Sequence, residues 1–329
     1  MHTLLCVVLS IMTLVWLLFW QITIANCVEV ERMAADLLLE DVQTHVGNFV
    51  RDNFEELVQS GCFLQLSKSS MAYALSSDGL KGLSEMELYR ATRAWISHDH
   101  SERRTSAYTL LRHIRFPLMT PAELLQISQE EDQSESSGRG GGGEGVDANV
   151  APEPPLMRSD TACINLLLEA SNYQMLPFVQ PLLQTERTQI RSDCVRLLAL
   201  GGVMRHQLVV SRELCFYEEK EEVEEGEEEE GGSGAKRGGS WRALQPMEVP
   251  RYQHGVALLG GFLFIVGGQS TYDTKGKTAV DSAYRYDPRF DRWLQMASLN
   301  EKRTFFHLSA LKGKLYAVGG RNATGEIGE

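Results

Sequence analysis

A chain of 329 residues, 43% hydrophobic and 23% charged, has room for about two globular domains. Its formal net charge of −12 gives no support to a nucleic-acid partner, for which a basic face is expected. The acidity is local, because residues 218–230 (EEKEEVEEGEEEE) hold ten Glu and one Lys, a pattern typical of a solvated loop.

The cysteines are scattered and include no C-x-x-C pair. This spacing argues against a zinc site of the usual kind and against a disulfide-rich secreted scaffold. A reducing, cytoplasmic location is therefore expected. The six cysteines are Cys6, Cys27, Cys62, Cys163, Cys194 and Cys215.

The N-terminus is hydrophobic. Residues 4–20 (LLCVVLSIMTLVWLLFW) approach the ~20 apolar residues that span a bilayer and are broken only by Ser10 and Thr13. No Lys or Arg precedes them, so the basic segment of a secretory signal is missing. Residues 1–25 are interpreted as a hydrophobic leader, either a signal anchor or a mispredicted exon, and membrane association would depend on residues 4–20.

Helical spacing follows the leader. Residues 84–98 predict a helix with a capping box, because Ser84 is followed three residues later by Glu87. Residues 121–127 (PAELLQI) predict another helix with Pro in its first turn. Residues 34–59 predict a helix or a helix pair, with an apolar stripe of Leu38, Val42, Val46, Phe49, Val50, Phe54 and Leu57.

A polar segment interrupts these helices. Residues 128–158 are rich in Ser, Gly and Pro and predict a disordered insert. Helical spacing resumes in residues 163–173 and 178–191, the second of which contains Pro181. We expect residues 26–193 to form one helical domain that carries this insert.

An internal repeat follows. Residues 251–269 match residues 303–321 at an offset of 52, and the matched positions include an Arg and a glycine pair. Trp241 and Trp293 keep the same offset, and this spacing is typical of a propeller blade. An earlier copy of the repeat ends at Gly201 and Gly202, and the blade that begins there is longer. An acidic insert at 218–239 accounts for the extra residues, and it is tolerated because the entropy cost of closing a loop rises slowly with its length. Residues 194–329 therefore predict about two and a half blades.

These blades resemble the kelch repeat, in which a glycine pair is followed by Tyr286-Asp287-Pro288 and then Trp293. With the helical domain in front, the chain resembles the BACK and kelch part of the kelch-like (BTB–BACK–kelch) family. The expected fold class is multidomain α + β, with an α-helical BACK-type bundle followed by an incomplete kelch β-propeller. The segments RFPLMTP, LLLEASNYQM and GGQSTYDTKGKTAVD are similar to the subgroup around kelch-like proteins nine, thirteen and twenty-six.

The chain departs from the family pattern at both ends. Members of the family begin with a BTB domain, which residues 1–25 do not resemble, and their propellers close with more blades. We therefore expect a truncated product or a partial gene model.

Two segments resemble nucleotide-binding motifs, but neither has the spacing or the sequence context that such a motif requires. A phosphate-binding loop that ends at Gly276-Lys277-Thr278 needs a glycine at position 271, where this chain has Thr271. Residues 138–143 (GRGGGG) satisfy G-x-G-x-x-G but follow no predicted strand, so a flexible linker is expected. We assign no catalytic, cofactor-binding or metal-binding residues, and we expect no enzyme activity.

The resemblance implies that partners bind the loops after the blade strands. The alternative for the charged residues of these loops is simple solvation. The candidate substrate contacts are Gln269, Tyr272, Lys275, Lys277, Arg303 and Arg321. The residues expected to build the blades are Gly201, Gly202, Trp241, Gly267, Gly268, Tyr286, Trp293, Gly319 and Gly320.

The resemblance also implies a function. Kelch-like proteins act as non-catalytic substrate-recognition adaptors of cullin-3 RING ubiquitin ligases, and residues 34–59 resemble the region that helps to contact cullin-3 beside the BTB domain. Without that domain the cullin-3 contact is expected to be weak, and the target is unknown. The alternative is a membrane-tethered kelch scaffold without a ligase role.

Overall fold

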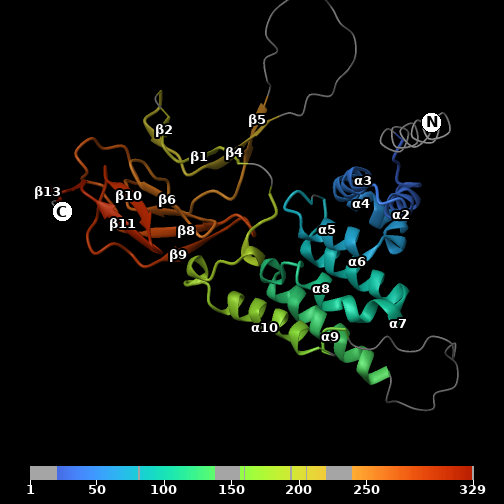
Figure 1. Ribbon diagram of the computed structural model, residues 1–329. Helices are drawn as coiled ribbons and strands as arrows, with labels where there is room; N and C mark the ends of the chain where they lie inside the picture. The colour runs from blue at the N-terminus through green and yellow to red at the C-terminus, as the bar shows by residue number, and fades with distance from the viewer. Residues whose placement is uncertain are drawn as a thin grey trace, which may run out of the picture. The chain divides into compact units, whose positions relative to one another are not determined.

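The computed structural model describes residues 21–80, 82–137, 156–158, 160–192, 195–204, 206–219 and 239–327 (Figure 1). The chain divides into two compact units, a helical unit (Met1–Pro177 with Gln184–Asp193) and a sheet unit (Phe178–Leu183 with Cys194–Glu329). The hydrophobic run at 4–20 lies outside the described residues, as does most of both predicted inserts. None of the helices in the described ranges has the length and apolar character needed to cross a bilayer.

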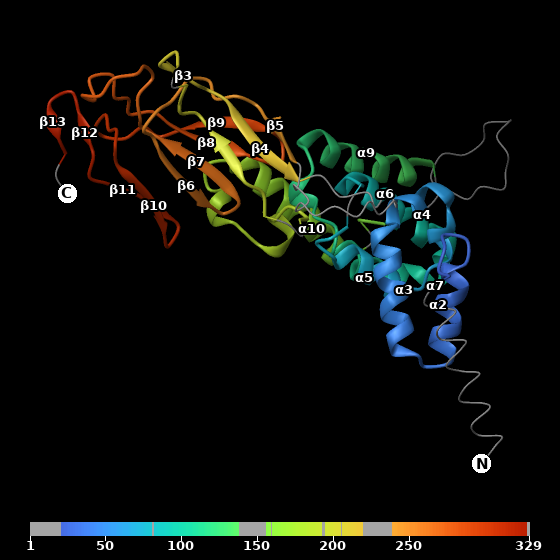
Figure 2. The ribbon, with the colours of Figure 1, turned by 90° about the horizontal axis from the view of Figure 1, so that it is seen from above.

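The helical unit is built from nine described α-helices with short 3-10 turns between them. Figure 2 shows the first two of these helices, α2 and α3, lying side by side, and α3 also packs on α5. The helices are α2 (Cys27–Asp36), α3 (Glu40–Asp52), α4 (Phe54–Ser60), α5 (Lys68–Ser76), α6 (Glu85–His98), α7 (His100–Arg103), α8 (Ala107–Leu111), α9 (Pro121–Ser137) and α10 (Thr161–Met175).

Local sequence chemistry explains where the main helices begin. The Ser84 side chain accepts from the Glu87 backbone N–H at 3.3 Å, and the Glu87 carboxylate accepts from the Ser84 N–H at 2.7 Å, so the predicted capping box is confirmed. Helix α9 begins at Pro121, as predicted, because proline fits a first-turn position that has no hydrogen bond to lose. Buried apolar side chains from α2 to α10 then form one continuous core.

The stripe predicted over residues 34–59 is mostly correct. Val42, Val46, Val50 and Leu57 are fully buried in the core of the helical unit. Leu38 is an exception: it is 82% exposed and has a φ of 55°, because it forms the turn that joins α2 to α3. The prediction counted it as helical, whereas it lies between two helices.

Two predicted boundaries differ from the structure. Helix α9 continues to Ser137, well into the segment assigned to the insert from residue 128. The reason is that Glu130 and Glu131 face the bundle: Glu130 pairs with Arg93 at 3.0 Å, and Glu131 accepts from the Met157 N–H at 2.9 Å. Residues 178–191 form only two 3-10 turns, Gln180–Leu182 and Glu186–Thr188, and not the predicted helix.

The last part of the helical unit, residues 184–193, is fastened by a buried arginine. Arg191 pairs with the Glu85 carboxylate at 2.7 Å, and the two side chains are 7% and 11% exposed. Its Nη1 also donates to the carbonyls of Leu75 at 2.7 Å and Ser77 at 2.9 Å. Removing one partner of a buried pair of this kind is strongly destabilising, because the charge that remains is uncompensated.

The sheet unit consists of antiparallel sheets. The complete example has the order β6-β7-β8-β9, and a three-stranded sheet has the order β1-β4-β5. Three further hairpins pair β2 with β3, β10 with β11, and β12 with β13. The described strands do not close into a ring, so the predicted helical domain followed by an incomplete propeller is confirmed. The strands are β1 (Leu198–Leu200), β2 (Val203–Met204), β3 (Val209–Val210), β4 (Leu214–Glu219), β5 (Gly239–Ala243), β6 (Gly255–Leu259), β7 (Phe262–Val266), β8 (Ala283–Asp287), β9 (Arg292–Met296), β10 (His307–Leu311), β11 (Lys314–Val318), β12 (Arg321–Asn322) and β13 (Gly325–Glu326).

The short segment Phe178–Leu183 belongs to the sheet unit although it precedes the last part of the helical unit. The Gln180 side chain accepts from Arg285 Nη2 on β8 at 2.9 Å, and both residues are buried. The Arg285 guanidinium also stacks on the Phe262 ring at 4.0 Å. These contacts explain why the helical spacing of this segment does not produce a helix.

Candidate functional site

Two of the glycine pairs, Gly201-Gly202 and Gly267-Gly268, lie where one blade meets the next. A β-carbon on Gly267 would lie 2.5 Å from the Arg303 carbonyl oxygen, and one on Gly201 would lie 2.6 Å from the Arg251 carbonyl oxygen. The second glycine of both pairs forms a backbone hydrogen bond across this contact. Gly268 N–H donates to the Arg303 carbonyl at 2.8 Å, and Gly202 N–H donates to the Arg251 carbonyl at 2.9 Å. The paired glycines, Gly201, Gly202, Gly267, Gly268, Gly319 and Gly320, have φ values between 56° and 101°, which favour glycine.

The repeated arginine holds the strand ends of its own blade. Arg251 is 1% exposed, and its Nη1 donates to the carbonyls of Gly267 at 2.6 Å and Ser282 at 2.9 Å. Arg303 repeats this arrangement, with Nη1 donating to the Gly319 carbonyl at 2.8 Å. The candidate substrate contact Arg303 is therefore engaged with backbone carbonyls, and its side chain builds the blade.

The Tyr and Trp side chains on neighbouring strands of each sheet pack ring against ring. Tyr286 and Trp293 have centroids 5.0 Å apart, and the Trp293 indole N–H donates to the Gln245 carbonyl at 2.9 Å. Tyr217 and Trp241 form the equivalent pair at 5.4 Å. Cross-strand aromatic contacts of this kind stabilise a sheet beyond the area that they bury.

The loop between β7 and β8, residues 269–281, is organised from inside by Gln269. This side chain is fully buried, donates from Nε2 to the Asp273 carbonyl at 2.9 Å, and accepts from the Thr278 hydroxyl at 3.3 Å. Its backbone pairs with that of Tyr252. Gln269 was a candidate substrate contact, but its burial makes it a support for the loop.

The Asp273 carboxylate orders the Gly-Lys-Thr segment. It accepts from the backbone N–H of Lys275 at 2.8 Å and from that of Lys277. These hydrogen bonds hold the pKa of Asp273 below its ordinary value. Since a carboxylate of the chain itself takes these two amides, they are not turned toward a phosphate, in agreement with Thr271 standing where the first glycine of a phosphate loop is required.

Three aromatic rings lie together at this end of the blades. Tyr252 is 5.8 Å from Tyr272 and 6.2 Å from Phe305, between ring centroids, and we call these three rings the aromatic shelf. The Arg321 guanidinium lies 4.7 Å above the Phe305 ring. Tyr272 is 41% exposed, so part of the shelf faces solvent.

The structure thus brings two of the six candidate contacts, Tyr272 and Arg321, onto one surface. Lys275 and Lys277 are exposed on the same loop as Tyr272. Sequence reasoning missed Tyr252 and Phe305. A usable signal was present, because both residues directly follow the repeated Arg by one or two positions.

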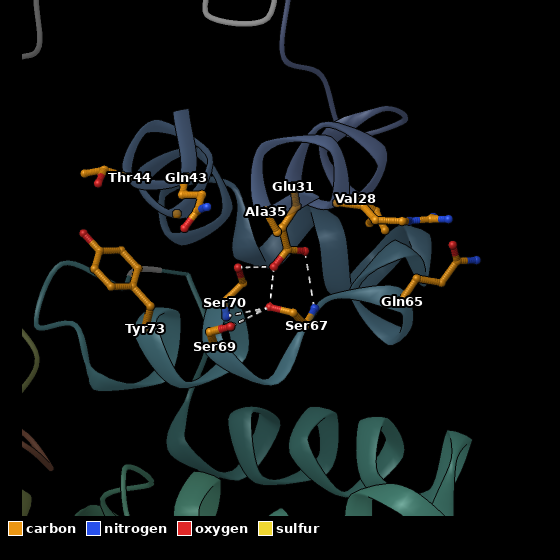
Figure 3. A pocket seen from close by; sticks show the side chains of 12 residues that line it. Val28, Glu31, Ala35, Gln43, Thr44, Gln65, Ser67, Ser69, Ser70 and Tyr73 are labelled. Atoms are coloured by element: carbon orange, nitrogen blue, oxygen red, sulfur yellow. Dashed lines mark hydrogen bonds between the residues drawn. The ribbon is translucent and has the colours of Figure 1, made fainter. Parts of the chain in front are cut away.

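The helical unit contains a groove of about 490 Å³ between α2, α3 and α5 (Figure 3). Glu31 lies at its centre and accepts from the Ser67 N–H at 3.3 Å and from the hydroxyls of Ser67 and Ser70. Ser67 is the N-cap of α5, so Glu31 already supplies the negative charge that this helix end favours. The groove therefore offers no vacant anion site.

Across the ranges that the structure describes, no three His, Cys, Asp or Glu side chains come together in a group that could hold a metal ion. His254 lies beside the glycine pair of its own blade, and burial lowers its pKa to about 4. It is therefore neutral at physiological pH.

Comparison with known proteins gives two family matches in chain order. The family described as "BTB And C-terminal Kelch" (BACK) matches residues 27–129, and "Kelch motif" matches residues 250–300. The first match covers α2 to the middle of α9, and the second covers the four-stranded sheet.

Full-length relatives are similar along almost the whole chain. Kelch-like protein 13 of Mus musculus is 50% identical over 306 residues, which cover 93% of this chain and 40% of that protein. Kelch-like protein 9 of Mus musculus is 48% identical over 93% of this chain and 43% of its own length. Kelch-like protein 26 of Mus musculus is 33% identical over 93% of this chain and 44% of its own length. The chain spans less than half the length of these relatives, and over 93% of its own length it is similar to kelch-like proteins, with one BACK match and one kelch match in chain order.

Proposed function

We propose that the chain is the target-binding part of a non-catalytic adaptor for a cullin-3 RING ubiquitin ligase. The sheet unit would hold a target protein while cullin-3 brings the ubiquitin-transfer machinery. Binding both at once raises the effective concentration of the target beside that machinery, which accelerates transfer without a catalytic group on the adaptor.

The observation that carries this proposal is the half-exposed aromatic shelf on a braced scaffold. Rings that are held in place and partly exposed give large contact area at low entropic cost, and aromatic and Arg side chains often dominate binding energy. The rings have that support: Tyr252 pairs with Gln269 through two backbone hydrogen bonds of 2.9 and 2.8 Å. The Arg321 backbone pairs in the same way with Thr304.

For the cullin-3 contact we propose the turn between α2 and α3. The apolar stripe of these helices is buried, so it is not available to a partner. Two neighbouring leucines are exposed instead, Leu37 by 52% and Leu38 by 82%.

Co-precipitation tests the cullin-3 contact. Leu37→Asp should lower the recovery of cullin-3 by about 10-fold, since an interface leucine is replaced by a charge. Leu168→Asp on α10 is the matched control, because Leu168 is also half-exposed and lies on another helix of the same unit. Equal recovery with both variants would remove the α2–α3 turn from the proposal. A longer form with a BTB domain should recover more cullin-3 than this chain, and equal recovery would contradict the role expected of that domain.

Target binding has a separate test. Proteins that accumulate with the adaptor when cullin ligases are inhibited should be recovered about 10-fold less by Tyr272→Ala. Tyr316→Ala is the control, because Tyr316 is similarly exposed on β11. If the two variants recover the same proteins equally well, the aromatic shelf is not the target site.

A further inference from the structure

The sheets of the sheet unit stack face to face in chain order. Leu214 of the three-stranded sheet packs in one cluster with Leu263 and Tyr286 of the four-stranded sheet. Val266 of the four-stranded sheet packs in another cluster with Leu308 of the β10–β11 hairpin. Leu263 and Val266 are three positions apart on β7, so their side chains point to opposite faces of that sheet. Figure 2 shows the four-stranded sheet between the hairpin and β4, so both of its faces contact another sheet.

The β10–β11 hairpin has one open face. Tyr316 and Val318 alternate along β11 with the residues that pack on the four-stranded sheet. At the 52-residue offset they match Phe264 and Val266, which are each 4% exposed, whereas Tyr316 is 45% and Val318 49% exposed. Leu311 lies on the same face by the hairpin register and is also exposed. We call Leu311, Tyr316 and Val318 the open β11 face, because no sheet within the described residues covers it.

The three-stranded sheet has an open face on its other side. Leu197 takes the position of Leu263 when the glycine pairs are aligned, and it is 64% exposed, whereas Leu263 is 6% exposed. Trp241, the counterpart of Trp293, is 51% exposed, whereas Trp293 packs against the neighbouring sheet. Tyr217 lies opposite Trp241 in the register of β4 and β5. We call Leu197, Tyr217 and Trp241 the open β1 face.

The contact between the last two blades indicates what fits these faces. In that contact Val266 packs with Leu315 of the following blade. Val318 takes the repeat position of Val266, and Leu197 takes that of Leu315, so the two open faces carry the two halves of the same contact. A pocket of about 350 Å³ along β1, which Ala199 lines, gives room for a side chain there.

We propose that a second copy of this chain binds head to tail, with the open β11 face of one copy against the open β1 face of the other. Exposed apolar faces of this kind mark interaction sites, and a second copy carries the matching face. The contact joins two different surfaces, so copies associate into a ring if the rotation closes and into a longer row if it does not. The inference goes beyond the proposed function, because it concerns a contact between copies and not the binding of a target.

Co-precipitation of two differently tagged copies of the full chain tests the proposal. Wild-type copies should recover each other. Val318→Glu in both copies, or Leu197→Glu in both copies, should lower this recovery by about 10-fold, because each change puts a charge into an apolar contact. Val318→Thr, which keeps the shape of the side chain, should also lower it. Val209→Glu on β3 is the matched control, because Val209 is as exposed as Val318, and it should leave the recovery unchanged.

A mixture of the two variants shows whether the contact is head to tail. The Val318→Glu copy keeps an intact β1 face, and the Leu197→Glu copy keeps an intact β11 face. One contact can therefore form between them, and the recovery of one copy with the other should return. Sedimentation velocity should show pairs of chains in this mixture and single chains in each variant alone. Both variants should keep the wild-type Tm, because the substituted side chains are exposed.

The proposal is overturned if wild-type copies do not recover each other, since the open faces then bind no second copy. Unchanged recovery in Val318→Glu or Leu197→Glu overturns it as well, because the copies would then meet elsewhere. A loss in Val209→Glu equal to that in Val318→Glu, or a mixture that recovers no more than each variant alone, also overturns it. Failure of the proposed function is separate, because it is measured by target recovery with Tyr272→Ala.

Discussion

Substituting alanine at two equivalent glycines separates backbone strain from contact between blades. Gly267 and Gly319 occupy the same repeat position and have φ values of 58° and 68°. They differ in their surroundings: a β-carbon on Gly319 meets nothing within 4 Å, whereas one on Gly267 meets the Arg303 carbonyl oxygen at 2.5 Å. Gly319→Ala is therefore the matched control for Gly267→Ala.

The expected magnitudes follow from these surroundings. Both variants place alanine in the left-handed region, which costs roughly 1–2 kcal/mol. In Gly267→Ala the next blade must also move away, because the 2.5 Å contact is with backbone. The movement breaks the hydrogen bond from Gly268 N–H to the Arg303 carbonyl and leaves a buried donor unpaired, at a further cost of about 1–3 kcal/mol. Gly267→Ala should thus be less stable than Gly319→Ala by about 2 kcal/mol.

Thermal unfolding followed by indole fluorescence measures this difference, because Trp293 packs on Tyr286 in the affected blade. A difference of about 2 kcal/mol corresponds to a Tm lower by about 4–8 °C for a unit of this size. Equal Tm values for the two variants would refute the reasoning, because the shared positive φ would then account for the whole effect.

Further predictions concern the helical unit and the loop. Arg191→Met should lower the free energy of unfolding by about 3–5 kcal/mol in urea titrations, because the Glu85 carboxylate keeps its hydrogen bond from the Arg115 N–H but loses the guanidinium that compensates its charge. Arg93→Met, at the more exposed pair with Glu130, should cost about 1 kcal/mol or less. Ser84→Ala should cost about 1 kcal/mol in the same assay by removing the N-cap of α6, and Ser84→Asp, which can also cap, should recover most of it; equal losses would contradict a capping role. Asp273→Asn should increase proteolysis of the 269–281 loop, because it removes the charge that the loop amides stabilise. The pKa of Asp273 is lowered in the folded state, so the stabilisation of the loop by the ionised carboxylate is complete above the ordinary pKa of 3.8 and is lost as pH falls through the lowered pKa. Protease resistance of the loop that is unchanged between pH 5 and the acid range would contradict this assignment.

Features that depend on local sequence were predictable. The capping box at Ser84 and the start of α9 at Pro121 are set by residues within one helical turn. The 52-residue offset fixed the equivalence of the blades, because each blade repeats the same glycine and Trp positions. These elements required no knowledge of distant contacts.

Features that depend on packing between distant residues were not predictable. Residues 178–191 have helical spacing, yet Gln180 is held by Arg285, which is 105 positions away in the chain. The repeat matched Arg303 to Arg251, but Arg303 was predicted as a substrate contact, because the repeat could not show that its guanidinium turns inward to the Gly319 carbonyl. For the same reason Gln269 was taken for a surface residue, and the contact of Tyr252 with Tyr272 and Phe305 was missed.

The interleaving of the two units has a consequence for synthesis. The ribosome releases Phe178–Leu183 before the residues that complete the helical unit, Gln184–Asp193. Arg285, the hydrogen-bond partner of Gln180, lies 105 residues further along the chain. At ordinary rates of translation it is therefore synthesised about 5–20 s after Gln180. The helical unit can therefore complete its fold before β8, the strand that binds Phe178–Leu183, has been synthesised. A cut in the chain just after residue 193 would separate the sheet unit from the piece that Arg285 binds.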